Sequence, residues 1–135
     1  MNYLIDTHIL LWIIFQKVKI NKSILNILED SKNRVIVSQI SIFEIAIKNK
    51  IGKLPDFPLT IEKLILIINE IGLDILPIKN EHIVSYESFL FNENHKDPFD
   101  RLILATSFYE DLVLISNDRN FEFYNDRITT IDNNY

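Results

Sequence analysis

The sequence contains no cysteine and only two glycines among its 135 residues. Without cysteine the chain forms no disulfide, thiol nucleophile or cysteine-based zinc site, so any bound metal must take oxygen or imidazole ligands. With Gly52 and Gly72 as the only glycines, it also has none of the glycine-rich loops that cradle nucleotide phosphates, and no G-x-S-x-G. These absences argue against nucleotide-cofactor enzymes and serine hydrolases.

Excess positive charge is missing too, because the net charge is -5 and the pI is about 5.1. This balance opposes the general attraction to phosphate that drives non-specific nucleic-acid binding. It counts less against a nuclease, whose acidic residues can belong to a metal site. The early apolar run Ile9–Phe15 is too short to span a bilayer, and no signal-peptide pattern precedes it. We therefore expect a cytoplasmic protein with no membrane partner.

Length and a hydrophobic content of 47% predict a single domain over residues 1–135 with a sizeable core. Strand-like runs alternate with helical patterns along the chain. Strands are expected at Tyr3–Ile5, Arg34–Ser38, Leu73–Ile78, Leu112–Ser116 and Arg127–Ile131, and helices at Ile9–Phe15, Asn21–Asp30, Ser41–Lys50, Ile61–Ile71, Glu81–Phe91 and Pro98–Tyr109. Apolar strands that alternate with helices predict an α/β fold: a three-layer domain whose parallel sheet has helices on both faces.

Four acidic residues stand just past an expected strand or in the first turn of an expected helix: Asp6, Glu44, Asp100 and Asp118. In a parallel sheet this placement brings them to the edge where the strands end. Carboxylates gathered in one cleft repel each other unless a cation joins them. Oxygen ligands without cysteine or clustered histidine favour Mg²⁺ or Mn²⁺, and such sites commonly carry out phosphoryl chemistry.

Helix capping is the alternative explanation for each acid taken singly. Ser41 and Glu44 match the S-x-x-E capping box, and Glu44 also forms a favourable i, i+4 pair with Lys48. Asp97 suits the N-cap of the helix that begins at Pro98, and Asp118 suits an Asx-turn or a cap. Four acids at one predicted edge are harder to attribute to capping, so together they favour the metal site.

Histidines and arginines near these acids are candidates for contact with a substrate phosphate. His8 follows Asp6 closely, and His95 lies in the polar loop 92–96. Arg101 and Arg119 each follow an acid of the quartet, and they could hold phosphates or simply neutralise their acidic neighbours. His82 is expected on the solvent-facing side of its helix. The three histidines are too scattered for a recognisable metal motif.

Four segments, taken in order and spacing, carry a resemblance to a known family: YLIDTHILLW, VSQISIFEIAIKNKIGKLP, HKDPFDRLILATS and LVLISNDRNF. Over nearly the whole chain the sequence resembles the PIN-domain family and, within it, the VapC-type toxins of bacterial toxin-antitoxin pairs. The resemblance implies that Asp6, Glu44, Asp100 and Asp118 are the metal-binding, catalytic acids. It further implies that Asp97 assists them and that Ser116 orients a water.

The activity implied by the resemblance is that of a Mg²⁺- or Mn²⁺-dependent endoribonuclease that cuts structured RNA, such as tRNA or rRNA, with an activated water. The implied partner is a cognate antitoxin whose tail places an arginine in the acidic cleft. Lys48, Lys50 and Lys53 would contact substrate phosphates. The apolar stretch LILII within Ile61–Ile71 exceeds one buried face, so we also expect a homodimer.

Other functions fit the sequence less well. A PIN-domain nuclease that processes RNA without being a toxin is the nearest alternative. A haloacid-dehalogenase-like phosphatase would have D-x-D after the first strand, where this chain has Asp6-Thr7-His8. A non-catalytic signalling module with an acidic pocket, such as a response-regulator receiver, would need a second acid beside Asp6 and a lysine at the end of a late strand, and neither is present.

Overall fold

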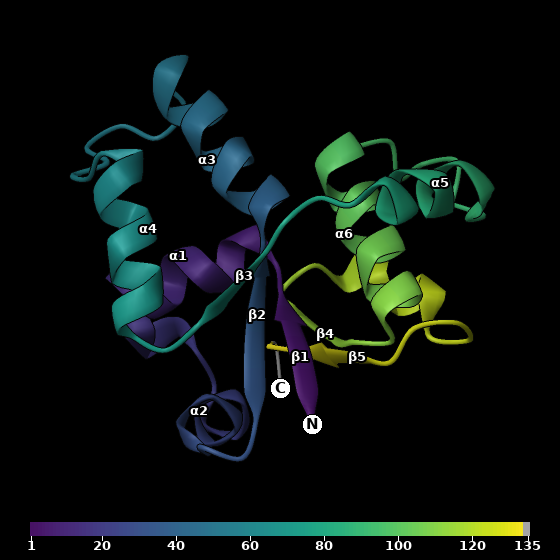
Figure 1. Ribbon diagram of the computed structural model, residues 1–135, viewed down its shortest axis with the longest axis horizontal. Coiled ribbons are helices and arrows are strands. Elements are labelled where there is room, and N and C mark those ends of the chain that lie inside the picture. Colours follow the sequence, from purple (N-terminus) through teal and green to yellow (C-terminus); the bar gives the residue numbers. More distant parts are fainter. Residues whose placement is uncertain (134–135) are drawn as a thin grey trace.

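The structure, a computed structural model that describes residues 1–133, is built on one parallel sheet (Figure 1). Its five strands are β1 (Asn2–Ile5), β2 (Arg34–Ser38), β3 (Asp74–Leu76), β4 (Val113–Ser116) and β5 (Thr130–Asp132). They lie in the order β3-β2-β1-β4-β5, and each neighbouring pair is parallel. The expected parallel α/β fold is therefore confirmed, and β3 lies at the edge that Pro77 predicted.

Helices cover both faces of this sheet. They are α1 (Thr7–Phe15), α2 (Lys22–Glu29), α3 (Gln39–Lys50), α4 (Ile61–Glu70), α5 (Asn80–Ser88) and α6 (Pro98–Glu110), with short 3₁₀ helices η1 (Lys17–Lys19) and η2 (Arg119–Tyr124). Tyr3 and Ile5 pack into the core beneath α1 to α4, whereas Leu4 packs into the core beneath α5, α6 and η2. This alternation explains why the central strands are apolar throughout, since both of their faces are buried.

Strand order places a crevice at the carboxyl ends of β1 and β4. From β1 the chain proceeds outward to β2 and β3, then returns to the other side of β1 to form β4 and β5. The connections that leave β1 and β4 therefore diverge, and ligands of open α/β sheets bind at such a switch point. The amide of Asp6 donates to the carbonyl of Ile115 on β4 at 3.1 Å, so Asp6 lies at this crevice.

Two helices begin two residues earlier in the chain than the sequence predicted. Helix α1 starts at Thr7, because the Asp6 side chain caps it by accepting from the Ile9 amide. Helix α3 starts at Gln39, because β2 runs directly into it and Ser38 is its cap. The predicted Ser41–Glu44 capping box is therefore wrong, and Glu44 lies in the second turn of α3.

The prediction that His82 faces solvent is also wrong. Its side chain is 1% exposed, accepts from the Lys79 amide and lies 3.4 Å from Glu110 of α6. Helix α5 packs this face against α6, and it ends at Ser88 because Phe89 turns into the core. Within residues 1–133, no helix is both long enough and apolar enough to cross a membrane.

Candidate active site

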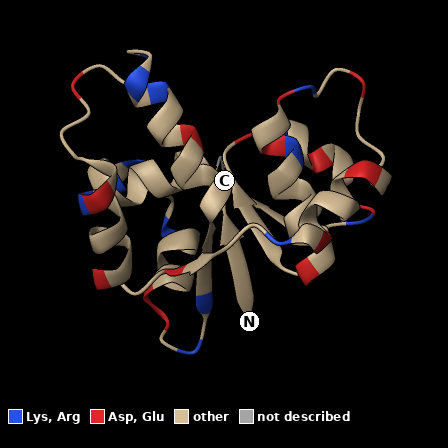
Figure 2. Cartoon of the chain, turned by 45° about the horizontal axis from the view of Figure 1, so that its top comes forward, with Lys and Arg blue, Asp and Glu red and all other residues tan. Residues whose placement is uncertain are grey.

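The four predicted acids meet in one pocket, which we call the acidic pocket. Its volume is about 300 Å³, and it opens where β1 and β4 end. Figure 2 shows acidic positions on α3 and at the start of α6, on either side of the carboxyl end of the sheet. The pocket is lined by Asp6, Thr7, His8, Glu44, Lys48, Asp97, Asp100, Asn117 and Asp118.

Asp6 forms the floor of the acidic pocket and is only 4% exposed. One carboxylate oxygen caps α1 by accepting from the Ile9 amide at 2.9 Å, and the other accepts from the Ser116 hydroxyl at 2.6 Å. The Ser116 oxygen in turn accepts from the amide of Asp118 at 2.9 Å. Ser116 thus ties the ends of β1 and β4 together, and each Asp6 oxygen retains a lone pair for a cation.

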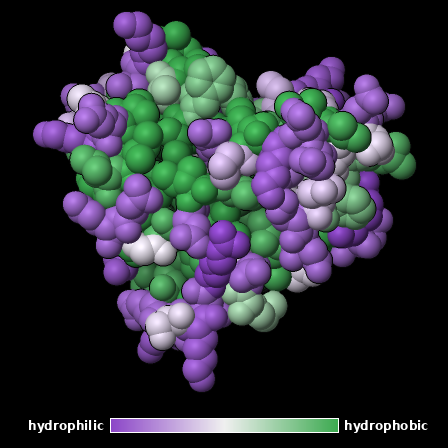
Figure 3. Space-filling view, in the orientation of Figure 1, coloured by the Kyte–Doolittle hydropathy of each residue, from purple (hydrophilic) through white to green (hydrophobic). Residues whose placement is uncertain are grey.

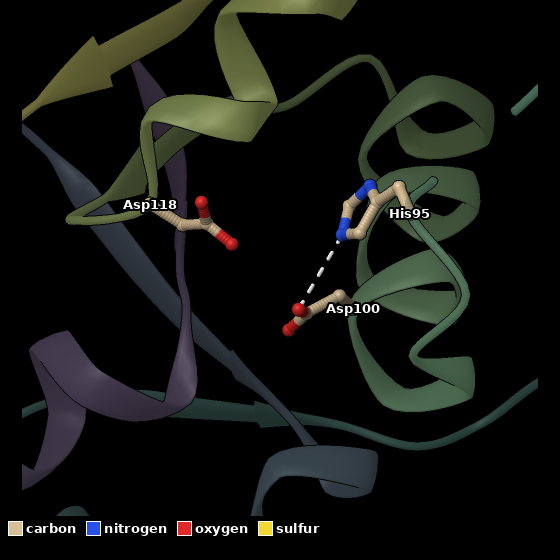
Figure 4. Close-up of side chains that lie close together, drawn as sticks. All are labelled: His95, Asp100 and Asp118. Carbon is tan, nitrogen blue, oxygen red and sulfur yellow. Dashed lines mark hydrogen bonds and ion pairs between the residues drawn. The ribbon is translucent and has the colours of Figure 1, made fainter. Parts of the chain in front are cut away.

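Asp118 and Asp100 face each other across the acidic pocket, together with His95 (Figure 4). One ligand atom from each of these three side chains lies within 4.8 Å of the others, which is close enough for a shared metal ion. Asp118 also caps η2 through the amide of Asn120. Asp97 caps α6 through the amides of Phe99 and Asp100. Capping and pocket lining are therefore combined in the same residues.

A hydrogen-bond chain orients His95 toward Asp100. The buried Tyr124 hydroxyl accepts from the Asn92 amide at 3.0 Å and lies 3.1 Å from His95 Nδ1. The Tyr124 oxygen already accepts one N–H, so its hydroxyl is well placed to donate to His95 Nδ1. A neutral His95 then carries its own proton on Nε2. That nitrogen lies 3.4 Å from Asp100 Oδ2, so His95 acts as a donor that orients Asp100.

Tyr124→Phe tests this orientation. Loss of the hydroxyl frees His95 to rotate and leaves the Asn92 amide without its acceptor. We therefore expect Mn²⁺ to bind about tenfold more weakly, which is the lower end of the loss in metal affinity when a residue that orients a metal ligand is removed. Isothermal titration calorimetry measures this change. Tyr109→Phe is the matched control, because Tyr109 is half exposed and lies outside the acidic pocket. Equal affinities in both variants would show that Tyr124 has no positioning role.

Glu44 reaches the acidic pocket from α3 and is 4% exposed. The hydroxyl of Thr7 donates to its Oε1 at 2.7 Å and lies 3.0 Å from the Ser41 hydroxyl. Its Oε2 pairs with Lys48 at 2.7 Å, as the i, i+4 spacing predicted. Lys48 is 37% exposed and therefore swings away from Glu44 at little cost when another cation or a phosphate arrives.

Two carboxyls of the acidic pocket hold their protons more tightly than usual. Burial raises the pKa of Asp6 from 3.8 to about 6, against the opposing hydrogen bonds from Ser116 and the Ile9 amide. Burial also raises the pKa of Asp100, and the charges of Asp97 and Glu44 act in the same direction, while the hydrogen bond from His95 opposes it. Ionised carboxylates are thus disfavoured in the acidic pocket unless a cation compensates them.

The donor set fits a hard divalent cation. Asp6, Asp100 and Asp118 offer carboxylate oxygens from three separate segments, and Glu44 adds a fourth once Lys48 leaves it. Such all-oxygen sites suit Mg²⁺ or Mn²⁺. The raised pKa values and the proximity of Asp100 and Asp118 are the two observations behind this assignment.

The structure separates the predicted phosphate-binding residues into two groups. His8 and Lys48 line the acidic pocket. Arg101 lies elsewhere, over the ring of Phe91 with its Nε donating to the His95 carbonyl, and Arg119 lines a different pocket. Lys50 lies in a shallow hollow on another side of α3. Sequence reasoning missed three residues near the site: Thr7, Asn117 and Tyr124. Thr7 and Asn117 adjoin Asp6 and Asp118 in the chain, whereas only a long-range contact with His95 brings Tyr124 there.

Solved structures with the same fold come from bacterial complexes. A chain of VapBC2 from Rickettsia felis, bound to a promoter DNA fragment, gives a TM-score of 0.69 at 17% identity, covering 98% of each chain. VapBC-1 from nontypeable Haemophilus influenzae gives 0.65 at 19% identity, covering 100% of each. VapBC-5 from Mycobacterium tuberculosis, of the VapBC family of toxin-antitoxin systems, gives 0.61 at 11%, covering 97% of this chain and 96% of that one.

No curated protein matches this sequence significantly. The sequence does match the PIN domain, and the match extends over residues 3–125, which include every residue that lines the acidic pocket. The parallel sheet, the switch-point crevice and the acidic pocket agree with that match. The chain therefore belongs to the PIN domain family.

Proposed function

We propose that this protein is a Mg²⁺- or Mn²⁺-dependent endoribonuclease and the toxin of a bacterial toxin-antitoxin pair, acting in the cytoplasm on structured RNA such as tRNA or rRNA. The convergence of Asp6, Glu44, Asp100 and Asp118 in one pocket at the switch point carries the proposal. Membership of the PIN family and the fold shared with VapBC complexes support it. No protein nucleophile is required.

The acids of the acidic pocket and the polar residues near them have different tasks in this proposal. Asp6, Asp100 and Asp118 hold the cation, Glu44 contributes directly or through water, and Ser116 keeps Asp6 in place. The divalent ion supplies Lewis acidity, which lowers the pKa of water and offsets the charge of a phosphodiester. Lys48 and His8, at the rim, meet the substrate phosphate, and Asp97 assists from the start of α6. The expected products carry a 5′-phosphate and a 3′-hydroxyl.

An antitoxin would cover apolar surface on α3. Phe43 and Ile51 are 56% and 59% exposed, and with Ala46 and Ile47 they form a shallow apolar hollow beside Lys50. Hydrophobic residues also reach the surface around α3 and α4 in Figure 3. Because Glu44 belongs to the same helix, a segment lying along α3 would extend into the acidic pocket. An arginine at its end would pair with the carboxylates and compete with the metal.

A homodimer is also part of the proposal. In α4 the stretch LILII buries Leu64 and Ile68 but leaves Leu66 54% exposed. Exposed apolar groups of this kind are typical of subunit surfaces. Sedimentation equilibrium of the purified protein measures the mass directly, and a monomer at micromolar concentration would contradict this part of the proposal.

Cleavage of RNA by the purified chain tests the enzymatic claim. With Mg²⁺ or Mn²⁺ present, we expect discrete cuts in total tRNA or rRNA, and EDTA should abolish them because the carboxylates alone cannot activate water. Sequencing of the new ends should find 5′-phosphates. Cleavage that persists in EDTA, or that also occurs in a Glu44→Gln preparation, would reveal a contaminating nuclease or a different mechanism.

The toxin role is separable from nuclease activity. Induced expression in a bacterial host should arrest growth, and a short neighbouring reading frame that encodes a DNA-binding antitoxin should restore it. An RNA-processing nuclease of the same family would instead be tolerated and would have no such neighbour. Growth that continues despite measurable RNA cleavage would favour the processing role.

A further inference from the structure

A second pocket adjoins the acidic pocket. Its volume is about 440 Å³, and it lies between the loop 92–96 and η2. Asn117 and Asp118 line the acidic pocket, and the next two residues along the chain, Arg119 and Asn120, line the second pocket. His95 also lines the second pocket, while its Nε2 faces Asp100. A chain-like ligand could therefore occupy both pockets at once.

Arg119 is the cation of the second pocket, and within residues 1–133 its side chain has no ion pair, hydrogen bond or ring contact. Of the four arginines in the sequence, Arg34 pairs with Asp74, Arg101 lies over Phe91, and Arg127 packs on two rings. Among residues 1–133, no carboxylate, carbonyl or ring engages Arg119 in this way. Guanidinium groups suit phosphates, which they bind with paired N–H donors.

The remaining wall of the second pocket offers groups that recognise a nucleobase. Asn92, Asn94 and Asn120 present side-chain amides, which carry both donors and acceptors. Phe123 is 58% exposed, so its ring is available for stacking, and base stacking on aromatic rings is the main mode of single-strand recognition. Glu122 adds an acceptor that suits the exocyclic amino group of cytosine, adenine or guanine.

Hydrogen bonds fix the frame of the second pocket in advance. Asn92 donates its amide to the Tyr124 hydroxyl, and its side chain accepts from the Asn94 amide at 3.0 Å. Across the pocket, the amide of Asn120 donates to Asp118 at 2.9 Å. Both walls are therefore tied to the buried Tyr124 or to the acidic pocket itself, and little ordering is needed on binding.

We propose that the second pocket binds one unpaired nucleotide of the RNA, next to the phosphate that lies in the acidic pocket. The base stacks on Phe123 and presents an amino edge to Glu122, and Arg119 binds the adjoining phosphate. This rests on the proposed function and adds to it a preference for a single-stranded nucleotide other than uridine beside the cut. The pocket size is within the range of small-ligand sites.

Binding of short single-stranded RNA to the full chain in EDTA tests the proposal without any cleavage. The probes are fluorescein-labelled oligoadenylate, oligocytidylate and oligouridylate, measured by fluorescence anisotropy. Phe123→Ala should weaken binding of the first two probes about 5- to 100-fold. Arg119→Gln should weaken binding of all three probes. It should also reduce the slope of log affinity against log salt concentration by about one, the loss expected for one phosphate contact. Glu122→Gln should reduce the preference for oligoadenylate and oligocytidylate over oligouridylate.

Matched controls are Phe15→Ala and Lys32→Gln, which remove an exposed ring at the end of α1 and an exposed cation before β2, outside both pockets. Unchanged affinity in Phe123→Ala overturns the proposal, even if Arg119→Gln binds more weakly, because charge attraction alone would then explain binding. Failure of the nuclease proposal is distinguishable. In that case the variants would still lose RNA binding in EDTA, while the wild-type chain would cut no RNA with Mg²⁺ or Mn²⁺.

Discussion

Asp6→Asn should fold normally and lose metal-dependent RNA cleavage by at least about 100-fold. Losing an outer-shell partner of a metal costs about 10- to 100-fold, and Asp6 is proposed as a direct ligand. Asparagine keeps the shape of the side chain and can still cap α1 by accepting from the Ile9 amide, so the fold should survive. Initial cleavage rates with saturating Mn²⁺ provide the measurement.

Asp56→Asn is the control for this substitution, because Asp56 is exposed and lies outside both pockets. It removes the same charge and should cleave RNA at the wild-type rate. Calorimetric unfolding of each variant separates loss of chemistry from loss of structure. A well-folded Asp6→Asn protein with full activity would mean that the carboxylate of Asp6 plays no part in catalysis.

In metal-free protein, Asp6→Asn should also be more stable than the wild type above pH 6. Burial raises the pKa of Asp6 to about 6, so between pH 4 and 6 the folded protein keeps a proton that the unfolded chain has lost. The free energy of unfolding of the wild type therefore falls as pH rises through this window. Asparagine has no proton to lose, so the variant should gain on the order of 2 to 3 kcal/mol above pH 6 and almost nothing below pH 4.

Urea unfolding at several pH values, with EDTA present, measures this difference between variant and wild type. Comparing the two proteins cancels the contribution of Glu110, which titrates in both and does not interact with Asp6. Added Mn²⁺ should then stabilise only the wild type above pH 6, by about 2.7 kcal/mol at a hundredfold excess over Kd. A stability difference that is independent of pH would contradict the burial of an ionised Asp6.

Of the elements next to the acidic pocket, the strands could be predicted from the sequence, because burial on both faces requires their residues to be apolar. β2 was predicted at its observed bounds, and β1 and β4 within one residue, because strands inside a three-layer fold must be apolar throughout. The start of α3 was not accessible in this way. Ser38 and Ser41 both precede helical residues, and only the direct passage of β2 into the helix selects Ser38 as the cap.

Site residues next to each other in sequence proved harder to assign. Arg101 follows Asp100 within α6, and one residue turns the helix by about 100°, so the guanidinium lies over Phe91 rather than in the acidic pocket. The role of His95 depends on Tyr124, which lies 29 residues away and carries no sequence signal for such a contact. The acids themselves were predictable because strand ends and helix starts locate the edge of a parallel sheet.

Anomalous scattering from a crystal grown with Mn²⁺ tests most directly whether the acidic pocket is a metal centre. The predicted result is a manganese peak in contact with oxygens of Asp6, Asp100 and Asp118. Absence of a peak from the acidic pocket, at Mn²⁺ concentrations that support RNA cleavage, would contradict the metal centre and the mechanism that depends on it.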